Sequence, residues 1–299
     1  MTFSIISHRK AYFIISGLLV AVSIAALAVF GLRFGIDFTG GALLEIRFPD
    51  GAPDNAAIAV ALEPIVGTTT IQQSEDGTTI IRMRDIDEET HQTALAALEG
   101  LGTAEELRFD SIGPTIGAEL KRSGVIAVAL GLVGIMLFVA YAFRGASEPV
   151  ASWQYGVITA LVGLLHDVLI PLGVFAVLGR TIGLETDTAF VAALLTVLGY
   201  SVNDTIIIFD RVRENLRRYG SSDFAGVVER SLHETLGRSL NTSLTVLFAV
   251  GAVWWFGGAG IRPFALALLV GVGSGTYSSI FLAAPMLVAL AERLQKKRA

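Results

Sequence analysis

The chain contains no cysteine and few charged residues. The absence of thiols excludes disulfides, cysteine nucleophiles and thiolate metal sites. Asp, Glu, Lys and Arg make up 16% of the 299 residues, against roughly a quarter in soluble proteins. Only four residues are lysines and none follows a glycine, so the phosphate-binding loop of nucleotide-driven proteins is also absent. A net charge of −5 gives no basic excess, so no nucleic-acid partner is expected.

The scarcity of charge leaves long apolar runs in the sequence. A hydrocarbon core ~30 Å thick is crossed by a helix of about 20 apolar residues. Runs of that length lie at 11–30, 123–143, 153–178, 188–209, 239–256 and 263–290. They predict a membrane all-α bundle of six transmembrane helices in a lipid bilayer. In the last run, Gly271 with Gly275 and Ser274 with Ser278 predict close helix packing.

The positions of Lys and Arg predict how these helices are oriented. Segments 1–10, 144–152, 210–238 and 291–299 hold 13 of the 22 basic residues, whereas the two short loops on the other side hold only Arg180 and Arg262. Because basic loops stay in the cytoplasm, both termini are predicted to be cytoplasmic. The first run is longer than the apolar region of a signal peptide, which favours an uncleaved helix over a cleaved leader.

Three regions follow from this orientation. A cytoplasmic tail with the first helix (1–30) is followed by an extracytoplasmic segment (31–122) and a five-helix transmembrane domain (123–299), which includes a cytoplasmic loop at 210–238. Arg and Glu alternate with apolar residues in that loop, which predicts an amphipathic helix on the membrane surface.

The segment 31–122 predicts a small α+β domain. Strand-type runs lie at 42–48, 68–73, 78–84 and 104–112, and helix-type runs at 53–66 and 87–98. The order β, α, β, β, α, β is typical of a ferredoxin-like fold. The segment has no cluster of metal-ligating residues, and its only histidine, His91, is expected at the surface. No metal or other cofactor is expected.

Two carboxylates interrupt the transmembrane runs, Asp167 after His166 and Asp204 after Asn203. A carboxylate inside a membrane costs several kcal/mol unless it is protonated, paired or hydrated. Each is therefore a candidate functional group, with a helix-to-helix ion pair or hydrogen bond as the structural alternative. Asp204 shares a helical face with Tyr200 and Asn203, and a second polar face carries Arg238, Asn241, Thr242 and Thr245. The two faces are expected to meet, with Asp204 paired to Arg238.

The depths of the two carboxylates predict that they do not touch. Counted at 1.5 Å per residue along unbroken helices, Asp167 lies about 15 Å closer to the outside than Asp204. Both carboxylates are expected to lie along one hydrated proton path, with Tyr200 between them. The separation argues against the close carboxylate dyad of an aspartyl protease. No nucleophile motif accompanies His166, so no enzymatic activity is expected.

Several motifs together resemble the SecD/SecF family, in its six-span SecF branch. They are Gly35-Ile36-Asp37-Phe38-Thr39-Gly40-Gly41, Gly113-Pro114-Thr115-Ile116-Gly117, His166-Asp167, Gly199-Tyr200-Ser201-Val202-Asn203-Asp204-Thr205 and Phe209-Asp210-Arg211-Val212-Arg213-Glu214-Asn215. The resemblance covers essentially the whole chain. From the residues alone, Gly35, Gly40 and Gly41 predict only a tight backbone turn beside Asp37.

The resemblance implies a half-transporter of the resistance-nodulation-division type in the bacterial cytoplasmic (inner) membrane, with residues 31–122 in the periplasm. It implies a proton-driven auxiliary subunit of the Sec translocase that acts with SecD in late steps of protein export. The implied partners are SecD, the SecYEG channel, other Sec accessory subunits and the translocating polypeptide. Asp204 and Arg238 match family residues linked to proton conduction, and Asp167, Asn203 and Tyr200 complete the expected relay.

Two other functions stay open. The same architecture is found in exporters of lipids or small hydrophobic molecules, although an autonomous exporter of this type normally carries twelve spans. The chain is also compatible with a scaffold that stabilises SecD without conducting protons, in which the aspartates only join helices.

Overall fold

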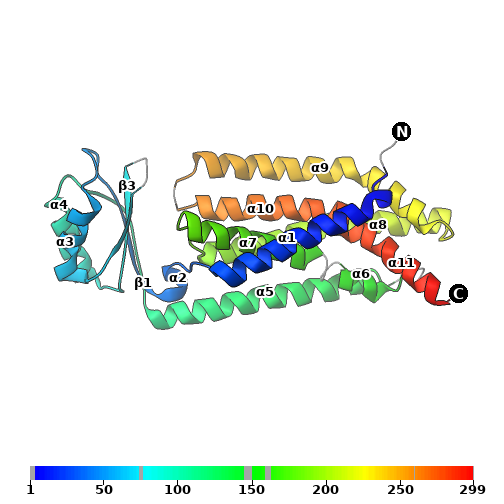
Figure 1. The fold of residues 1–299 in the computed structure, drawn as a ribbon, viewed down its shortest axis with the longest axis horizontal. Coiled ribbons are helices and arrows are strands. Elements are labelled where there is room, and N and C mark those ends of the chain that lie inside the picture. Colours follow the sequence, from blue (N-terminus) through cyan, green and yellow to red (C-terminus); the bar gives the residue numbers. More distant parts are fainter. Residues whose placement is uncertain (1–3, 74–76, 145–149, 159–162, 259, 299) are drawn as a thin grey trace. The chain divides into compact units, whose positions relative to one another are not determined.

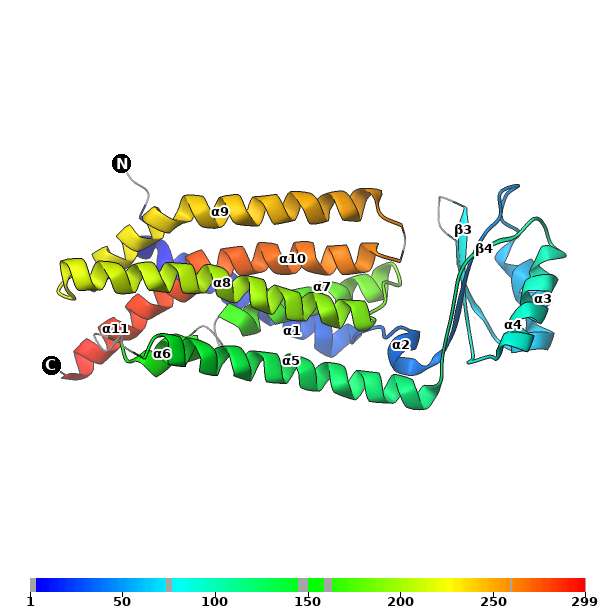
Figure 2. The ribbon, with the colours of Figure 1, turned by 180° about the vertical axis from the view of Figure 1, so that it is seen from behind.

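The computed structural model describes residues 4–73, 77–144, 150–158, 163–258 and 260–298. The chain forms two compact units (Figures 1 and 2). We call Phe34–Val125 the sheet unit, and Met1–Arg33 with Ile126–Ala299 the helical unit. Helix α5 (Pro114–Ala142) begins in the sheet unit and ends in the helical unit.

The sheet unit is a four-stranded sheet with two helices on one face (Figure 1). All neighbouring strands are antiparallel, in the order β2-β3-β1-β4. Along the chain the elements are β1 (Gly41–Arg47), α3 (Asn55–Val66), β2 (Thr70–Gln73), β3 (Thr78–Met83), α4 (Glu88–Glu99) and β4 (Glu105–Ile112). The order of strands and helices is the one expected from the sequence.

The core of the sheet unit lies between the sheet and the two helices. Alternate residues of a strand point to the same face, and in β1 this places Leu44 and Ile46 in the core, both fully buried. They are joined by Ile81 of β3, Leu62 of α3 and Leu98 of α4. Apolar burial therefore stabilises this unit, as in a soluble domain.

His91 is buried, so the expectation that it lies at the surface is wrong. Its ring stacks on Phe109 with 3.7 Å between the ring centroids, and it is 3% exposed. Nε2 lies 3.2 Å from Oε2 of Glu106. The reason is helical spacing, because His91 precedes the buried Ala94 and Leu98 by three and seven residues and so lies on the face of α4 that packs on the sheet.

The helical unit consists mainly of long apolar helices. Its elements are α1 (Arg9–Phe30), the end of α5, α6 (Ser152–Ile158), α7 (Leu165–Thr181), α8 (Thr188–Tyr219), α9 (Phe224–Phe256), α10 (Arg262–Ser278) and α11 (Ala284–Arg298). A π-helical turn, Ser279–Ala283, joins α10 to α11. The start of α1, the α8–α9 turn and the end of α11 lie at the same end of the unit (Figure 1).

Five helices among the described residues are long and apolar enough to cross a membrane. They are Ile6–Phe30, Pro114–Ala142, Thr188–Tyr219, Phe224–Phe256 and Arg262–Lys296. The remaining expected span, 153–178, comprises α6 and α7, and its residues 159–162 lie outside the described residues. The described chain is therefore mostly helical, with five candidate membrane spans and one small antiparallel sheet.

The expected cytoplasmic loop 210–238 is helical. The residues before Tyr219 continue α8, those from Phe224 begin α9, and only a short turn separates them. Asn215 of α8 donates hydrogen bonds to Ser231 Oγ (3.0 Å) and Glu234 Oε2 (2.8 Å) of α9. A span was expected to end at its first charged residue, but charged side chains continue a helix readily when it leaves the apolar layer.

Candidate functional site

Asp167 is the centre of a buried polar cluster in the helical unit. It lies in the first turn of α7 and is fully buried. Its Oδ1 lies 2.9 Å from Nδ1 of His166 and accepts a hydrogen bond from Ser274 (3.1 Å). Its Oδ2 accepts hydrogen bonds from Ser278 of α10 (2.8 Å) and from Ser201 of α8. Three helices thus supply donors to one carboxylate, which we call the Asp167 cluster.

Small residues allow this cluster to form. A Cβ atom added to Gly275 would lie 2.8 Å from Cβ of Ser201 and 3.4 Å from Oδ2 of Asp167. One turn earlier, a Cβ on Gly271 would overlap Val197. Glycine at these positions lets α10 approach α8 closely enough for short hydroxyl side chains to reach the carboxylate.

His166 extends the cluster toward α1. Its ring lies over Tyr277 with 6.0 Å between centroids, and the Tyr277 hydroxyl accepts a hydrogen bond from Ser16 (3.2 Å) and donates one to the carbonyl of Tyr12 (3.3 Å). Nε2 of His166 is buried and has no hydrogen-bond partner among the residues that the structure describes. A buried ring nitrogen without a partner is a place where an ordered water molecule is readily accommodated.

Asp204 forms a second cluster on the same buried face of α8. The side chain is 1% exposed, and its Oδ2 accepts a hydrogen bond from Ser243 of α9 (3.3 Å). Tyr200 donates a hydrogen bond to the same Ser243 hydroxyl (3.3 Å), and Thr276 Oγ1 of α10 lies 2.7 Å from it. We call these residues the Asp204 cluster.

The two clusters occupy adjacent turns, so the expected separation of about 15 Å in depth is wrong. Ser201, which contacts Asp167, precedes Asp204 by three residues on α8, a rise of ~4.5 Å. The expectation assumed an unbroken helix from Trp153. Residues 159–162 of that run lie outside the described residues, so its continuity is not part of the comparison, and the contact between Asp167 and Ser201 sets the position of Asp167 relative to α8.

The expected pairing of Asp204 with Arg238 is not formed. Arg238 is exposed, and no ion pair within the described ranges joins it to Asp204. Arg238 precedes Ser243, which does contact Asp204, by five residues, or ~7.5 Å along α9. Asn203 is also exposed, whereas Tyr200 is half-buried.

A different polar face of α9 meets the other helices. Ser231, Thr235, Ser239 and Ser243 are buried, whereas the expected stripe of Asn241, Thr242 and Thr245 is exposed. Thr242 and Thr245 donate hydrogen bonds to carbonyls of their own helix, at 3.0 Å and 2.7 Å. Because these hydroxyls find acceptors within α9 itself, they can lie on an exposed face without a partner helix.

The glycine motif lies in the sheet unit. Gly35 is buried and accepts a hydrogen bond from Thr39 Oγ1 (3.0 Å), and Asp37 is half-buried in the one-turn helix α2 (Ile36–Thr39). Gly40 and Gly41 follow with positive φ of 75° and 125°, so the backbone makes the tight turn that the glycines predict.

Two motifs that are distant in the sequence form one site there. A Cβ on Gly40 would lie 2.7 Å from Cα of Pro114, and a Cβ on Gly117 would lie 2.9 Å from the backbone nitrogen of Gly40. The glycine turn therefore packs directly on the start of α5, and a side chain at either position would separate them. Sequence reasoning found both motifs but not their contact.

The described residues offer no metal site, since no three His, Asp or Glu side chains gather in them. What the buried groups can do is hold a proton. A carboxylate that gains a proton changes from acceptor to donor, and the serine hydroxyls around it can reverse their hydrogen bonds in response. Ser201, Ser243, Ser274, Ser278 and Thr276 were not among the expected site residues.

Comparisons with known proteins agree with this architecture. The family model for the C-terminal region of SecD/SecF protein export membrane proteins matches residues 92–293, and the model for the SecD/SecF GG motif matches residues 25–48. The protein translocase subunit SecF of Thermobaculum terrenum is 44% identical, over 95% of this chain and 92% of the relative. The SecF subunit of Synechocystis is 38% identical, with the same shares covered.

Longer relatives join this sequence to a second part. A SecDF protein of Brucella abortus is 38% identical over 92% of this chain but only 35% of its own length. The crystal structure of SecDF from Thermus thermophilus superposes with a TM-score of 0.83 at 32% identity, covering 96% of this chain and 38% of that one. The present chain thus belongs to the SecD/SecF family of protein-export membrane proteins, and its relatives of similar length are SecF subunits.

Proposed function

We propose that this chain is a proton-driven auxiliary subunit of the bacterial Sec translocase, which acts with SecD in late steps of protein export. Its relatives are named protein translocase subunit SecF, and the matching family model describes protein export membrane proteins. The observation that supports proton coupling is the pair of buried carboxylates: Asp167 of α7, which contacts α8 at Ser201, and Asp204, which lies one turn further along α8. Carboxylates are retained inside membranes mainly where ions or protons move.

Proton coupling requires that protonation changes the packing of helices. Asp167 joins α7, α8 and α10, and Asp204 joins α8 and α9 through Ser243. Neutralising either carboxylate removes a charge that these hydroxyls stabilise and so biases how the four helices pack. Each charge that crosses the membrane field supplies about 2.3 kcal/mol per 100 mV, which is of the order of such conformational differences.

The exposed polar residues of α8 and α9 would face SecD. Arg238 and Asn203 are exposed, as are Asn241, Thr242 and Thr245 of α9, and an unpaired cation in lipid is unfavourable. SecDF relatives carry SecD and SecF in one chain, which supports SecD as the subunit that covers this surface. In this arrangement Arg238 pairs with a group of SecD and not with Asp204.

The finer architecture belongs to the same proposal. Six transmembrane helices are proposed, with both termini in the cytoplasm and the sheet unit in the periplasm as a ferredoxin-like domain. Its support is the strand order β2-β3-β1-β4 with both helices on one face and the concentration of basic residues at the end of the bundle where α1 begins and α11 ends. SecYEG and the translocating polypeptide are proposed as further partners.

Export in membrane vesicles tests proton coupling. Vesicles are prepared with SecD and either the unaltered chain or its Asp204→Asn or Asp167→Asn variant. The fraction of export that is completed is measured with and without a proton gradient. Both variants are expected to lose the stimulation by the gradient. Asp223→Asn is the matched control, because Asp223 is exposed and only caps α9, a role that asparagine fills equally well. Unchanged stimulation in the Asp204 and Asp167 variants would favour a scaffold role.

A further inference from the structure

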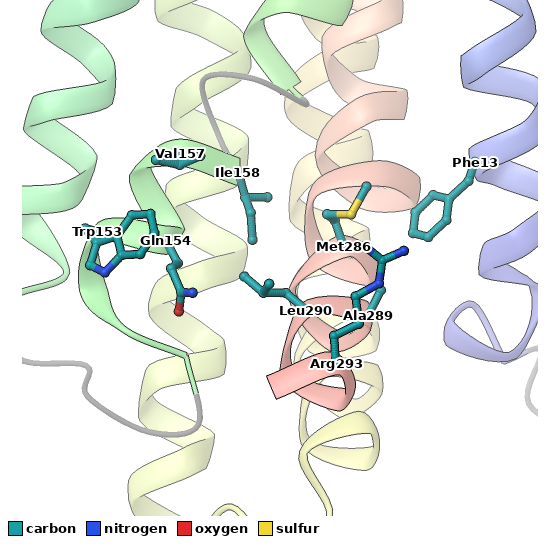
Figure 3. Close-up of a pocket in the computed structure, with 9 residues that line it drawn as sticks. All are labelled: Phe13, Trp153, Gln154, Val157, Ile158, Met286, Ala289, Leu290 and Arg293. Atoms are coloured by element: carbon teal, nitrogen blue, oxygen red, sulfur yellow. The ribbon is translucent and has the colours of Figure 1, made fainter. Parts of the chain in front are cut away.

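A cavity of about 410 Å³ lies among α1, α6 and α11 of the helical unit (Figure 3). It is distinct from both carboxylate clusters. Apart from Gln154 and Arg293, the side chains that line it are apolar, including Phe13 of α1, Trp153 of α6 and Leu290 of α11. The volume is in the range of sites that bind small organic molecules.

The cavity opens on a surface of the unit that is already apolar. Trp153 at its edge is 59% exposed, and on α1 the neighbouring Ile14 and Leu18 are 71% and 63% exposed. A helix face of this composition suits contact with acyl chains, and tryptophan is enriched where such chains meet the headgroups. The occupant therefore enters from the lipid and carries an apolar chain.

One cation is placed at this apolar cavity. Arg293 is exposed, and in Figure 3 its side chain extends along α11 toward Met286 and Phe13. No ion pair or hydrogen bond involves its guanidinium within the described part of the chain, and the adjacent Glu292 pairs with Arg9 at 2.7 Å. Gln154 accepts a hydrogen bond from the Ala151 backbone through Oε1 (2.8 Å), so its amide NH₂ group is left as a donor.

We propose that this cavity binds one anionic phospholipid, with an acyl chain against α6 and α11 and the phosphate at Arg293. Basic pockets between membrane helices recognise anionic headgroups in this way. The lipid belongs to the leaflet next to the basic end of α11, where Lys296 follows Arg293. A bound lipid would fill the space between α6 and α11 and hold α6 in place beside the bundle.

Native mass spectrometry of the full chain in detergent tests this site. The protein is incubated with dioleoyl phosphatidylglycerol or with dioleoyl phosphatidylcholine, which differ in the charge of the headgroup, and retained lipid is counted. We expect one retained phosphatidylglycerol, favoured about fivefold over phosphatidylcholine, because one cation at a membrane surface contributes that much selectivity. Arg293→Ala should abolish the preference.

The matched control is Arg217→Ala, which removes an exposed arginine of α8 outside the cavity and should leave the preference unchanged. Ala289→Trp fills the cavity and should remove the retained lipid of either kind. Inorganic phosphate should not compete, because it has no acyl chain. Equal binding of the two lipids by the unaltered chain, an equal effect of the two arginine variants, or competition by phosphate would overturn the proposal. The measurement needs neither export nor a proton gradient, so it succeeds or fails independently of the proposed function.

Discussion

The sheet unit and the helical unit distribute polar and apolar side chains in opposite ways. In the sheet unit, Leu44, Ile46 and Ile81 are fully buried and the charged side chains lie mainly outside. In the helical unit, Asp167 and Asp204 are buried with serines and threonines, while large apolar residues such as Phe248, 74% exposed, lie on the outer surface. The first pattern is that of a domain in water, and the second is that of a bundle in lipid.

This contrast determines which positions of each unit tolerate substitution. In water, apolar burial is the main source of stability. In lipid, the outer surface gains nothing from being buried, so close packing and internal hydrogen bonds determine how helices associate. Substitutions of the same kind should therefore have unequal effects in the two units.

The largest difference is expected for leucine. Leu44→Ala removes a fully buried side chain of the sheet unit and should lower its free energy of unfolding by about 2–5 kcal/mol. Leu18→Ala removes an exposed side chain of α1 and should change stability by about 0.5 kcal/mol or less. Hydrogen exchange of β1 and β3 amides in the full chain measures the first effect, and exchange of α1 amides measures the second. Equal effects would contradict the contrast between the two units.

A second test asks whether the glycine turn of the sheet unit depends on close approach. Gly40 and Gly51 both have positive φ, which alanine adopts at a cost of ~1–2 kcal/mol. Only at Gly40 would the new Cβ meet another segment, 2.7 Å from Pro114. Gly40→Ala should therefore lower stability by about 1–3 kcal/mol more than Gly51→Ala. The two variants are compared by hydrogen exchange, and equal losses would mean that the turn alone matters.

How far the sequence predicts this molecule depends on how each region encodes its structure. The strands and helices of the sheet unit follow from local alternation, and the order of elements expected for residues 31–122 is the order observed. His91 was misplaced because its polar side chain was expected to face water, although its spacing to Ala94 and Leu98 puts it on the buried face of α4.

In the helical unit, Asp167 and Asp204 stand out in the sequence because the runs around them lack charge. The residues that contact them could not be predicted in the same way. On α9, the faces containing Ser243 and Thr242 both repeat at helical spacing, and only the packing decides that Ser243 meets Asp204. The contact between Ser201 of α8 and Asp167 of α7 is also not encoded, because a serine in an apolar run does not indicate which helix it meets. Long-range packing, which the sequence pattern does not encode, brings Asp167 of α7 beside Ser201, one turn before Asp204 on α8.

A third test addresses packing in the helical unit. Gly275→Ala places a Cβ 2.8 Å from Cβ of Ser201, whereas Gly273→Ala has open space at the same helix. The alanine at 275 should lower stability by about 1–3 kcal/mol relative to the alanine at 273, because α10 must move away from α8 and stretch the hydrogen bonds to Asp167. Thermal unfolding in detergent measures the difference. Equal melting temperatures would mean that the close approach of α10 to α8 at Gly275 does not contribute to stability.

A smaller effect is expected at Glu229, in the charged stretch of α9 that precedes the apolar run 239–256. Glu229 of α9 accepts hydrogen bonds from the backbone N–H groups of Ile5 and Ile6, both at 2.7 Å, where the chain enters α1. Burial opposes its ionisation, but these hydrogen bonds, with one from Ser4, outweigh burial and lower the pKa of Glu229 below its ordinary value of 4.5. An anion at a helix N-terminus is stabilising by up to ~1 kcal/mol.

The sign of the pH dependence follows from that lowered pKa. Because the folded chain binds this proton less readily than the unfolded chain, the contribution of Glu229 is present above pH 4.5 and is lost as the pH falls through its native pKa. Glu229→Gln should lower the melting temperature at pH 7 but leave it nearly unchanged at the acidic end, where the native carboxyl is protonated too. Thermal unfolding of both proteins between pH 7 and pH 3 measures this, and a constant difference across that range would show that Glu229 acts through its shape and not its charge.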